Sequence, residues 1–97
     1  MMSVVDINLR WIKNRPTNHS PRGQKFSLPV RFDHQGDDWT ANAWSLVIEV
    51  EGVPDITGYQ RGTARFLVPS GPQEWLRPGK KFTIFEGATP LAIGEVE

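Results

Sequence analysis

Apolar and polar residues alternate along the final third of this 97-residue chain, which is the pattern of half-buried β-strands. Residues 81–86 place Phe82 and Ile84 on one face of a strand, and residues 65–69 repeat the same period. Between these two runs lies Pro78-Gly79, a turn signal because proline presets one backbone angle and glycine accepts a positive one. The pattern therefore predicts two strands that pair across this corner.

The chain then reverses at residues 86–90 and ends in a further apolar stretch that includes Leu91 and Val96. A helix is disfavoured here because Pro90 and Gly94 would both interrupt it. In a strand, Gly94 suits a bulge or a close approach of neighbouring atoms. We expect a closing strand whose apolar side chains share one dry interior with Phe82.

Three stretches upstream show the same alternation, namely residues 5–11, 26–32 and 44–50. Within the second of them, Pro29 indicates an edge position, because proline has no N–H to donate to a neighbouring strand. Residues 14–23 form a polar loop by composition, and long loops in compact domains often carry function. The whole chain, residues 1–97, reads as one all-β domain that curls into a small barrel.

Composition agrees with one small core. The chain is 38% hydrophobic, with four tryptophans and five phenylalanines that bury large areas per residue. It has no cysteine, which excludes disulfides and thiolate metal ligands. The N-terminal residues lack the pattern of a signal peptide, and no run approaches the roughly 20 apolar residues that cross a bilayer. We expect a soluble, cytoplasmic protein that does not engage a membrane; its oligomeric state is left open.

Residues 81–96 read Lys-Phe-Thr-Ile-Phe-Glu-Gly-Ala-Thr-Pro-Leu-Ala-Ile-Gly-Glu-Val, preceded by a strand at 65–69 and a Trp-Leu-Arg-Pro-Gly corner at 75–79. This block resembles the closing part of the third, C-terminal domain of bacterial elongation factor Tu, over about a third of the chain. The resemblance implies a six-stranded antiparallel barrel without GTPase chemistry, which in that family helps to hold aminoacyl-tRNA. It also implies a partner contact by the glutamate of the turn, which corresponds to Glu86.

The turn departs from the family pattern at three positions. Phe85 stands where the family has arginine, Ala88 where it has a second glycine, and Thr89 where it has another arginine. Contacts to nucleic-acid phosphates depend mainly on lysine and arginine. The resemblance therefore implies the fold more strongly than it implies an RNA ligand.

Charge is balanced overall but uneven along the sequence. Residues 1–31 hold six basic residues and one acidic residue, whereas residues 32–60 hold six acidic residues and no basic one. Adjacent antiparallel strands from the two segments would neutralise each other. If they lie apart, the chain has a basic face suited to RNA or an acidic face suited to a basic protein.

The first basic segment is the candidate RNA surface, because basic side chains near an aromatic residue can combine phosphate attraction with base stacking. Trp11 and His19 are interleaved with it, although Trp11 falls on the apolar face of its strand and is favoured as a core residue. The basic residues of this surface are Arg10, Lys13, Arg15, Arg22 and Lys25.

A protein partner is the other possibility. Phe85, on the outer face of its strand, and Trp75, at the corner, would together form an exposed apolar patch of the kind found in protein interfaces. Alternatively, the N-terminal strand or the long loop covers one or both of them.

Catalytic and metal chemistry have weak candidates. His34 lies near Asp33, Asp37 and Asp38, but a solvated turn accounts for these residues better than a cation site does. His19-Ser20 lacks an identifiable activating partner, and glycine-rich phosphate-binding motifs are absent. We expect no catalytic residue, no metal and no nucleotide or other cofactor.

The sequence thus predicts a non-catalytic, stand-alone binding module of the elongation factor Tu C-terminal type, which acts on a protein or RNA partner with a link to translation. The alternative is an immunity or inhibitor protein that blocks a protein target through its acidic middle segment.

Overall fold

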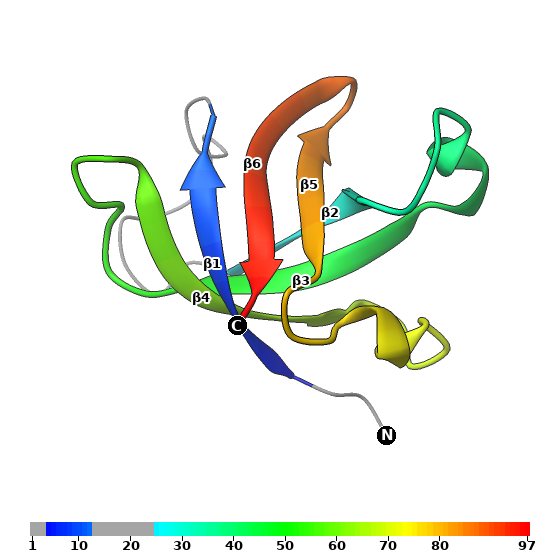
Figure 1. The fold of residues 1–97 in the computed structure, drawn as a ribbon, viewed down its shortest axis with the longest axis horizontal. Helices are drawn as coiled ribbons and strands as arrows, with labels where there is room; N and C mark the ends of the chain where they lie inside the picture. Colours follow the sequence, from blue (N-terminus) through cyan, green and yellow to red (C-terminus); the bar gives the residue numbers. More distant parts are fainter. Residues whose placement is uncertain (1–3, 13–24) are drawn as a thin grey trace.

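The computed structural model describes residues 4–12 and 25–97, which form a β-barrel with very little helix (Figure 1). The strands are β1 (Val5–Trp11), β2 (Lys25–Phe32), β3 (Trp44–Val50), β4 (Tyr59–Phe66), β5 (Lys81–Glu86) and β6 (Thr89–Val96). Two short 3-10 helices, η1 (Trp39–Asn42) and η2 (Gln73–Trp75), interrupt the connections β2–β3 and β4–β5.

The six strands close on themselves in the order β1-β4-β3-β2-β5-β6, and every neighbouring pair is antiparallel. This confirms the predicted all-β, six-stranded antiparallel barrel. The order also has a geometric consequence, because β1 and β2 are separated by two strands in either direction around the ring. β1 and β2 therefore form opposite walls of the barrel, and their outward side chains point in opposite directions.

The barrel interior is filled by the inward side chains of all six strands, as period-two alternation requires. Phe82, Ile84 and Val96 lie in this core, as the sequence predicts. The prediction was wrong for Leu91, which is buried but does not belong to the core cluster, because the neighbouring Ala92 has the inward-facing place on β6. Gly94 shows the expected close approach, because a Cβ atom built on it would lie 2.4 Å from Cζ of Phe82. The bulge of this hairpin lies instead at Ile84/Phe85.

Pairing across the Pro78-Gly79 corner was a wrong prediction. β4 ends at Phe66 and pairs with β1 and β3, whereas β5 pairs with β2 and β6. Leu67 and Val68 are 48% and 41% exposed, so they do not continue the inward-facing pattern of the strand. The chain instead turns at Gly71, where a Cβ atom would lie 2.4 Å from Cγ of the Phe66 ring, and the connection runs past the end of the barrel.

Pro29 occupies a local edge. β2 pairs on both sides, but its register with β5 covers only Val30–Phe32, and Pro29 is opposite Ser45 of β3. The missing N–H of Pro29 is therefore accommodated where only one neighbouring strand is in register.

The acidic middle segment is divided between the two ends of β3. Asp33, Asp37 and Asp38 precede that strand, Glu49 lies near its end, and Glu51 and Asp55 follow it. Seven residues of strand span about 20 Å, so the two acidic groups are well separated.

Some of the charge is neutralised locally. Lys25 lies opposite Glu49 in the ladder between β2 and β3, and Lys80 forms a 3.2 Å ion pair with Asp33. Arg61 pairs with Glu97 at 2.9 Å.

In the portion of the chain that is described, no helix combines the length and the apolar character needed to span a bilayer.

Candidate functional site

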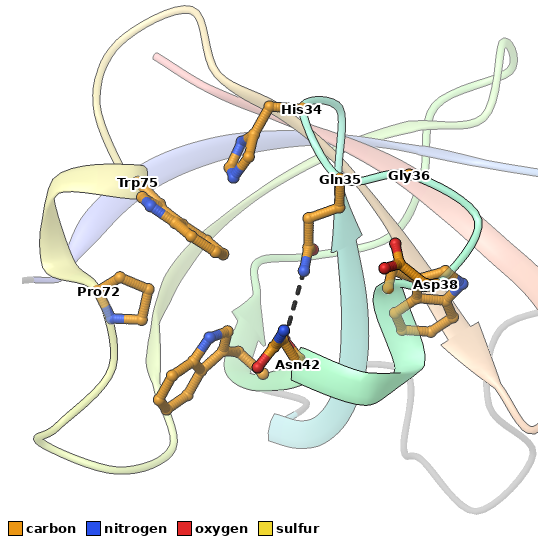
Figure 2. A pocket seen from close by; sticks show the side chains of 9 residues that line it. His34, Gln35, Gly36, Asp38, Asn42, Pro72 and Trp75 are labelled. Carbon is orange, nitrogen blue, oxygen red and sulfur yellow. Dashed lines mark hydrogen bonds between the residues drawn. The ribbon is translucent and has the colours of Figure 1, made fainter.

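A pocket of about 400 Å³ lies at one end of the barrel, between the β2–β3 connection and η2. Figure 1 shows η1, in green-cyan, and η2, in yellow, on the same side of the barrel. Figure 2 shows side chains from both connections around one hollow. The lining residues are His34, Gln35, Gly36, Asp38, Trp39, Asn42, Trp44, Pro72 and Trp75.

Trp75 forms the wall that η2 contributes. Its indole packs edge to face against Phe32 in the core, with ring centroids 5.2 Å apart, and against His34, with centroids 4.3 Å apart. Because Phe32 is fully buried, Trp75 is anchored from below by the barrel interior. His34 is exposed and is held at the rim by Trp75.

Trp39 forms the wall that η1 contributes. Its indole stacks on the ring of Phe85, which belongs to β5, with centroids 4.7 Å apart and planes inclined by 29°. Trp39 is half-buried and is also one of the residues that line the pocket. A residue from a polar turn is thereby fixed to the outside of the barrel.

Trp44 forms the base as the first residue of β3. Its ring meets Phe66 of the core nearly at right angles, with centroids 6.0 Å apart. The three indoles therefore come from three separate parts of the chain, and each is braced by a phenylalanine: Phe32, Phe66 or Phe85.

Gln35 holds the β2–β3 connection in shape. Its side-chain oxygen accepts a hydrogen bond from the backbone N–H of Phe32 at 2.9 Å, and its side-chain nitrogen donates to the backbone oxygen of Asn42 at 3.3 Å (Figure 2). Its backbone N–H donates to the Phe32 carbonyl at 3.0 Å. Both ends of the Gln35 amide are therefore engaged in the fold.

Asp38 is the one formally charged side chain among the described residues of the lining. It is exposed, and within the described part of the chain no ion pair holds its carboxylate. Asp37 is exposed beside it in sequence but lies outside the lining. The electrostatic character of this pocket is therefore acidic.

The ionisable side chains of the described lining are His34 and Asp38. The described lining contains no serine, threonine, cysteine or lysine that could act as a nucleophile. Across residues 4–12 and 25–97, no three histidine, aspartate or glutamate side chains are grouped as metal ligands. The described lining offers aromatic surface and one carboxylate to a ligand.

The predicted RNA surface is described only in part. Arg10 lies on β1 beside Tyr59 and Ile93, and Lys25 begins β2 opposite Glu49. Since β1 and β2 form opposite walls, the structure does not bring Arg10 and Lys25 onto one face. The other members of that surface lie outside the described residues: Lys13, Arg15, Arg22 and the interleaved His19.

The remaining predicted site residues are Glu86, Trp75 and Phe85, of which only Trp75 lines the pocket. Glu86 is exposed at the end of β5, opposite Thr89 across the turn. Trp75 and Phe85, predicted as one patch, have separate places, since Trp75 lines the pocket while Phe85 lies behind Trp39.

The alternation pattern does not single out Trp39, and it marks Trp44 only as a strand residue. One signal was present in the sequence: Trp39 is a large aromatic residue in a polar turn, outside any alternating run. Such a residue needs either a partner within the fold or a ligand.

A second hollow, of about 440 Å³, lies toward the other end of the barrel. Its lining mixes acidic and basic residues and includes the buried Gln60. The Gln60 side chain accepts from Trp11 Nε1 at 2.9 Å and donates to the backbone oxygens of Glu51 and Gly52. Its polar atoms are used in holding the strands, so the tryptophan-lined pocket is the better candidate.

Comparison of the chain with protein-family models, curated proteins and solved structures found no match. The barrel agrees with the fold that the resemblance to elongation factor Tu implies, but a small six-stranded barrel does not identify that family. Conclusions about function therefore depend on the chain's own residues.

Proposed function

We propose that this protein is a non-catalytic binding module that holds a protein partner at the tryptophan-lined pocket. The observation that carries the proposal is the convergence of Trp39, Trp44 and Trp75 on one cavity of about 400 Å³. Tryptophan is enriched among the residues that contribute most to binding energy in protein interfaces.

Preorganisation supports the proposal. Each indole is braced by a phenylalanine, and Gln35 ties the intervening connection to β2 and to Asn42. A site that is already ordered loses little conformational entropy when its partner binds.

Charge favours protein over RNA at this site. Asp38 in the lining and Asp37 beside it would repel phosphates. Arg10 and Lys25, the described members of the predicted RNA surface, lie on opposite walls of the barrel, which disfavours one continuous contact with a nucleic-acid backbone. RNA binding is therefore the alternative that nuclease treatment in the capture experiment must exclude.

A link to translation is supported only by the resemblance of residues 81–96 to elongation factor Tu. It is the reason to look first among translation factors and ribosomal proteins for the partner. The inhibitor alternative has less support, because the acidic segment is split between two ends of β3 and only Asp38 lines the pocket.

Affinity capture from native lysate, with and without nuclease, tests this proposal. Three baits are compared: the unaltered chain, Trp39→Ala, and the control Tyr59→Ala, which removes an aromatic side chain 48% exposed outside the pocket. We expect a protein held by the unaltered chain and by Tyr59→Ala, lost with Trp39→Ala, and insensitive to nuclease. Equal capture by Trp39→Ala, or loss after nuclease, would overturn the proposal.

A further inference from the structure

We propose that the pocket recognises a quaternary ammonium group, carried by a trimethylated lysine side chain of the protein partner. This inference deepens the proposed function and rests on it. It commits the tryptophan-lined pocket to one ligand chemistry, and four properties of the lining point to that chemistry.

The first property is aromatic surface on several sides. A cation is attracted to the electron-rich face of an aromatic ring, and tryptophan gives the strongest such attraction among side chains. Trp39 stacks on Phe85 and lines the pocket, while Trp44 and Trp75 contribute from β3 and η2. A cation held in this pocket therefore has three indoles in the surrounding wall.

The second property is the sign of the charge. The lining holds Asp38 and, in the part of the chain that is described, no lysine or arginine. Figure 2 shows Asp38 on the side of the hollow opposite Trp75, at the turn with Gly36. A cation between the indoles therefore gains attraction from a carboxylate and meets no described basic side chain of the lining.

The third property is that the Gln35 amide is not available to a ligand, which leaves the Asp38 carboxylate as the one charged acceptor in the described lining. Both ends of the Gln35 amide already bond within the fold, to Phe32 and Asn42. An ordinary lysine brings three N–H donors and an arginine brings five, and desolvating unpaired donors is unfavourable. A trimethylated ammonium has no N–H, so it keeps its charge without requiring acceptors.

The fourth property is size and access. A volume of about 400 Å³ is at the lower end of the range for ligand pockets and can hold a single side chain. Gly36, Asp38 and Asn42 are exposed, so the cavity is open to solvent along the β2–β3 connection. A group on a flexible lysine stem can enter from that side.

The four tryptophans make a direct experiment possible, because three line the pocket and Trp11 does not. The indole of Trp11 is bonded to Gln60 elsewhere in the barrel and serves as an internal control. In two-dimensional 1H-15N NMR spectra, titration with tetramethylammonium chloride should shift the indole N–H signals of Trp39, Trp44 and Trp75, while the Trp11 signal stays unchanged. Sodium chloride at equal concentration provides the ionic-strength control.

Four further probes distinguish which kind of molecule carries the ammonium group and how much its positive charge contributes to binding. They are a trimethyl-lysine peptide, the same peptide unmethylated, choline, and 3,3-dimethylbutan-1-ol. The last is the neutral carbon analogue of choline. We expect the trimethyl-lysine peptide to bind best, and the neutral analogue to bind about tenfold more weakly than choline.

Matched variants test the carboxylate and the ring. Asp38→Asn should weaken binding of the trimethyl-lysine peptide several-fold, whereas Asp37→Asn, an equal charge change just outside the lining, should have a much smaller effect. Trp39→Leu should weaken it by about tenfold or more. The fold of each variant is checked by its remaining NMR signals, so loss of binding is distinguished from loss of structure.

Several results would overturn the inference. Equal affinity for choline and its neutral analogue would show an apolar site without cation selectivity, and equal affinity for the unmethylated peptide would remove the argument from hydrogen bonds. Tighter binding of choline than of the trimethyl-lysine peptide would reject a protein-borne group. Absence of binding by every probe, while lysate capture still depends on Trp39, would reject the ammonium and leave the proposed function standing.

Discussion

The ring of Phe85 stacks beneath the indole of Trp39, with centroids 4.7 Å apart, and so joins the β2–β3 connection to the outer face of β5. Phe85 also occupies the position at which the elongation factor Tu pattern, which residues 81–96 resemble, has arginine. Its ring supports one wall of the pocket.

Replacing Phe85 with alanine should loosen this wall while leaving the barrel closed. An aromatic pair contributes about 0.5–1.5 kcal/mol beyond its buried area, so we expect the melting temperature to fall by several degrees. Amide hydrogen exchange should accelerate in residues 36–43 and stay unchanged in β1 and β6. Uniform acceleration over the whole barrel would contradict a local role for the stack.

Gly94→Ala should destabilise the barrel from within. The added Cβ would lie 2.4 Å from Cζ of Phe82, a ring that is 1% exposed and cannot move away freely. Overpacking of this kind costs about 1–3 kcal/mol, measurable by denaturant unfolding. Combining Gly94→Ala with Phe82→Leu should cost less than the sum of the two single changes.

The matched glycine control for that experiment is Gly36→Ala. Its Cβ would meet only Asp38 Oδ1, at an ordinary 3.5 Å. We expect its unfolding free energy to stay close to that of the unaltered chain. A loss as large as that of Gly94→Ala would show that the Phe82 contact is not the cause.

Trp11 and Gln60 share a hydrogen bond, so the effects of changing these two residues on the unfolding free energy should depend on each other. Gln60 is 3% exposed, so Gln60→Met leaves the Trp11 indole N–H without its acceptor in a part-buried place, at a cost of about 1–3 kcal/mol. Trp11→Phe together with Gln60→Met should recover part of this loss, because neither polar partner then remains unpaired. Unfolding curves of Gln60→Met, Trp11→Phe and the double variant measure the coupling, and strict additivity would argue against it.

Asp55 should make stability depend on acid pH. The Thr57 hydroxyl, which donates to its carboxylate at 2.6 Å, and the Tyr59 N–H, at 3.0 Å, hold the pKa of Asp55 below its usual 3.8. A depressed folded-state pKa means that the stabilisation is present above the unfolded value and is lost as pH falls through the folded pKa. The advantage of the unaltered chain over Asp55→Asn should therefore be full near neutral pH and shrink below 3.8.

An NMR titration of the Asp55 carboxyl checks the same claim directly. Thr57→Val removes the donating hydroxyl and should move the pKa of Asp55 back toward its usual value. A carboxyl that titrates at the same pH in both proteins would refute the assigned cause.

Period-two alternation was enough to predict most of the strands, because a half-buried strand must separate apolar from polar side chains residue by residue. The same pattern placed Phe82 and Ile84 inward, and the missing side chain of Gly94 indicated a close neighbour. It failed at residues 65–69, where an alternating run extends past the end of β4 into an exposed turn. Periodicity reports which side chains share a face and says nothing about where the partner strand ends.

What the sequence determined by itself was therefore the class of fold and most of the residues of its interior, with Leu91 as an exception. What only the tertiary structure decided was which strands are neighbours, and hence that β1 and β2 stand on opposite walls and that Trp39, Trp44 and Trp75 converge. The physical reason is range: alternation is a local property of the chain, whereas strand order depends on how all six strands close at once. Residues far apart in sequence meet at the pocket only after that closure.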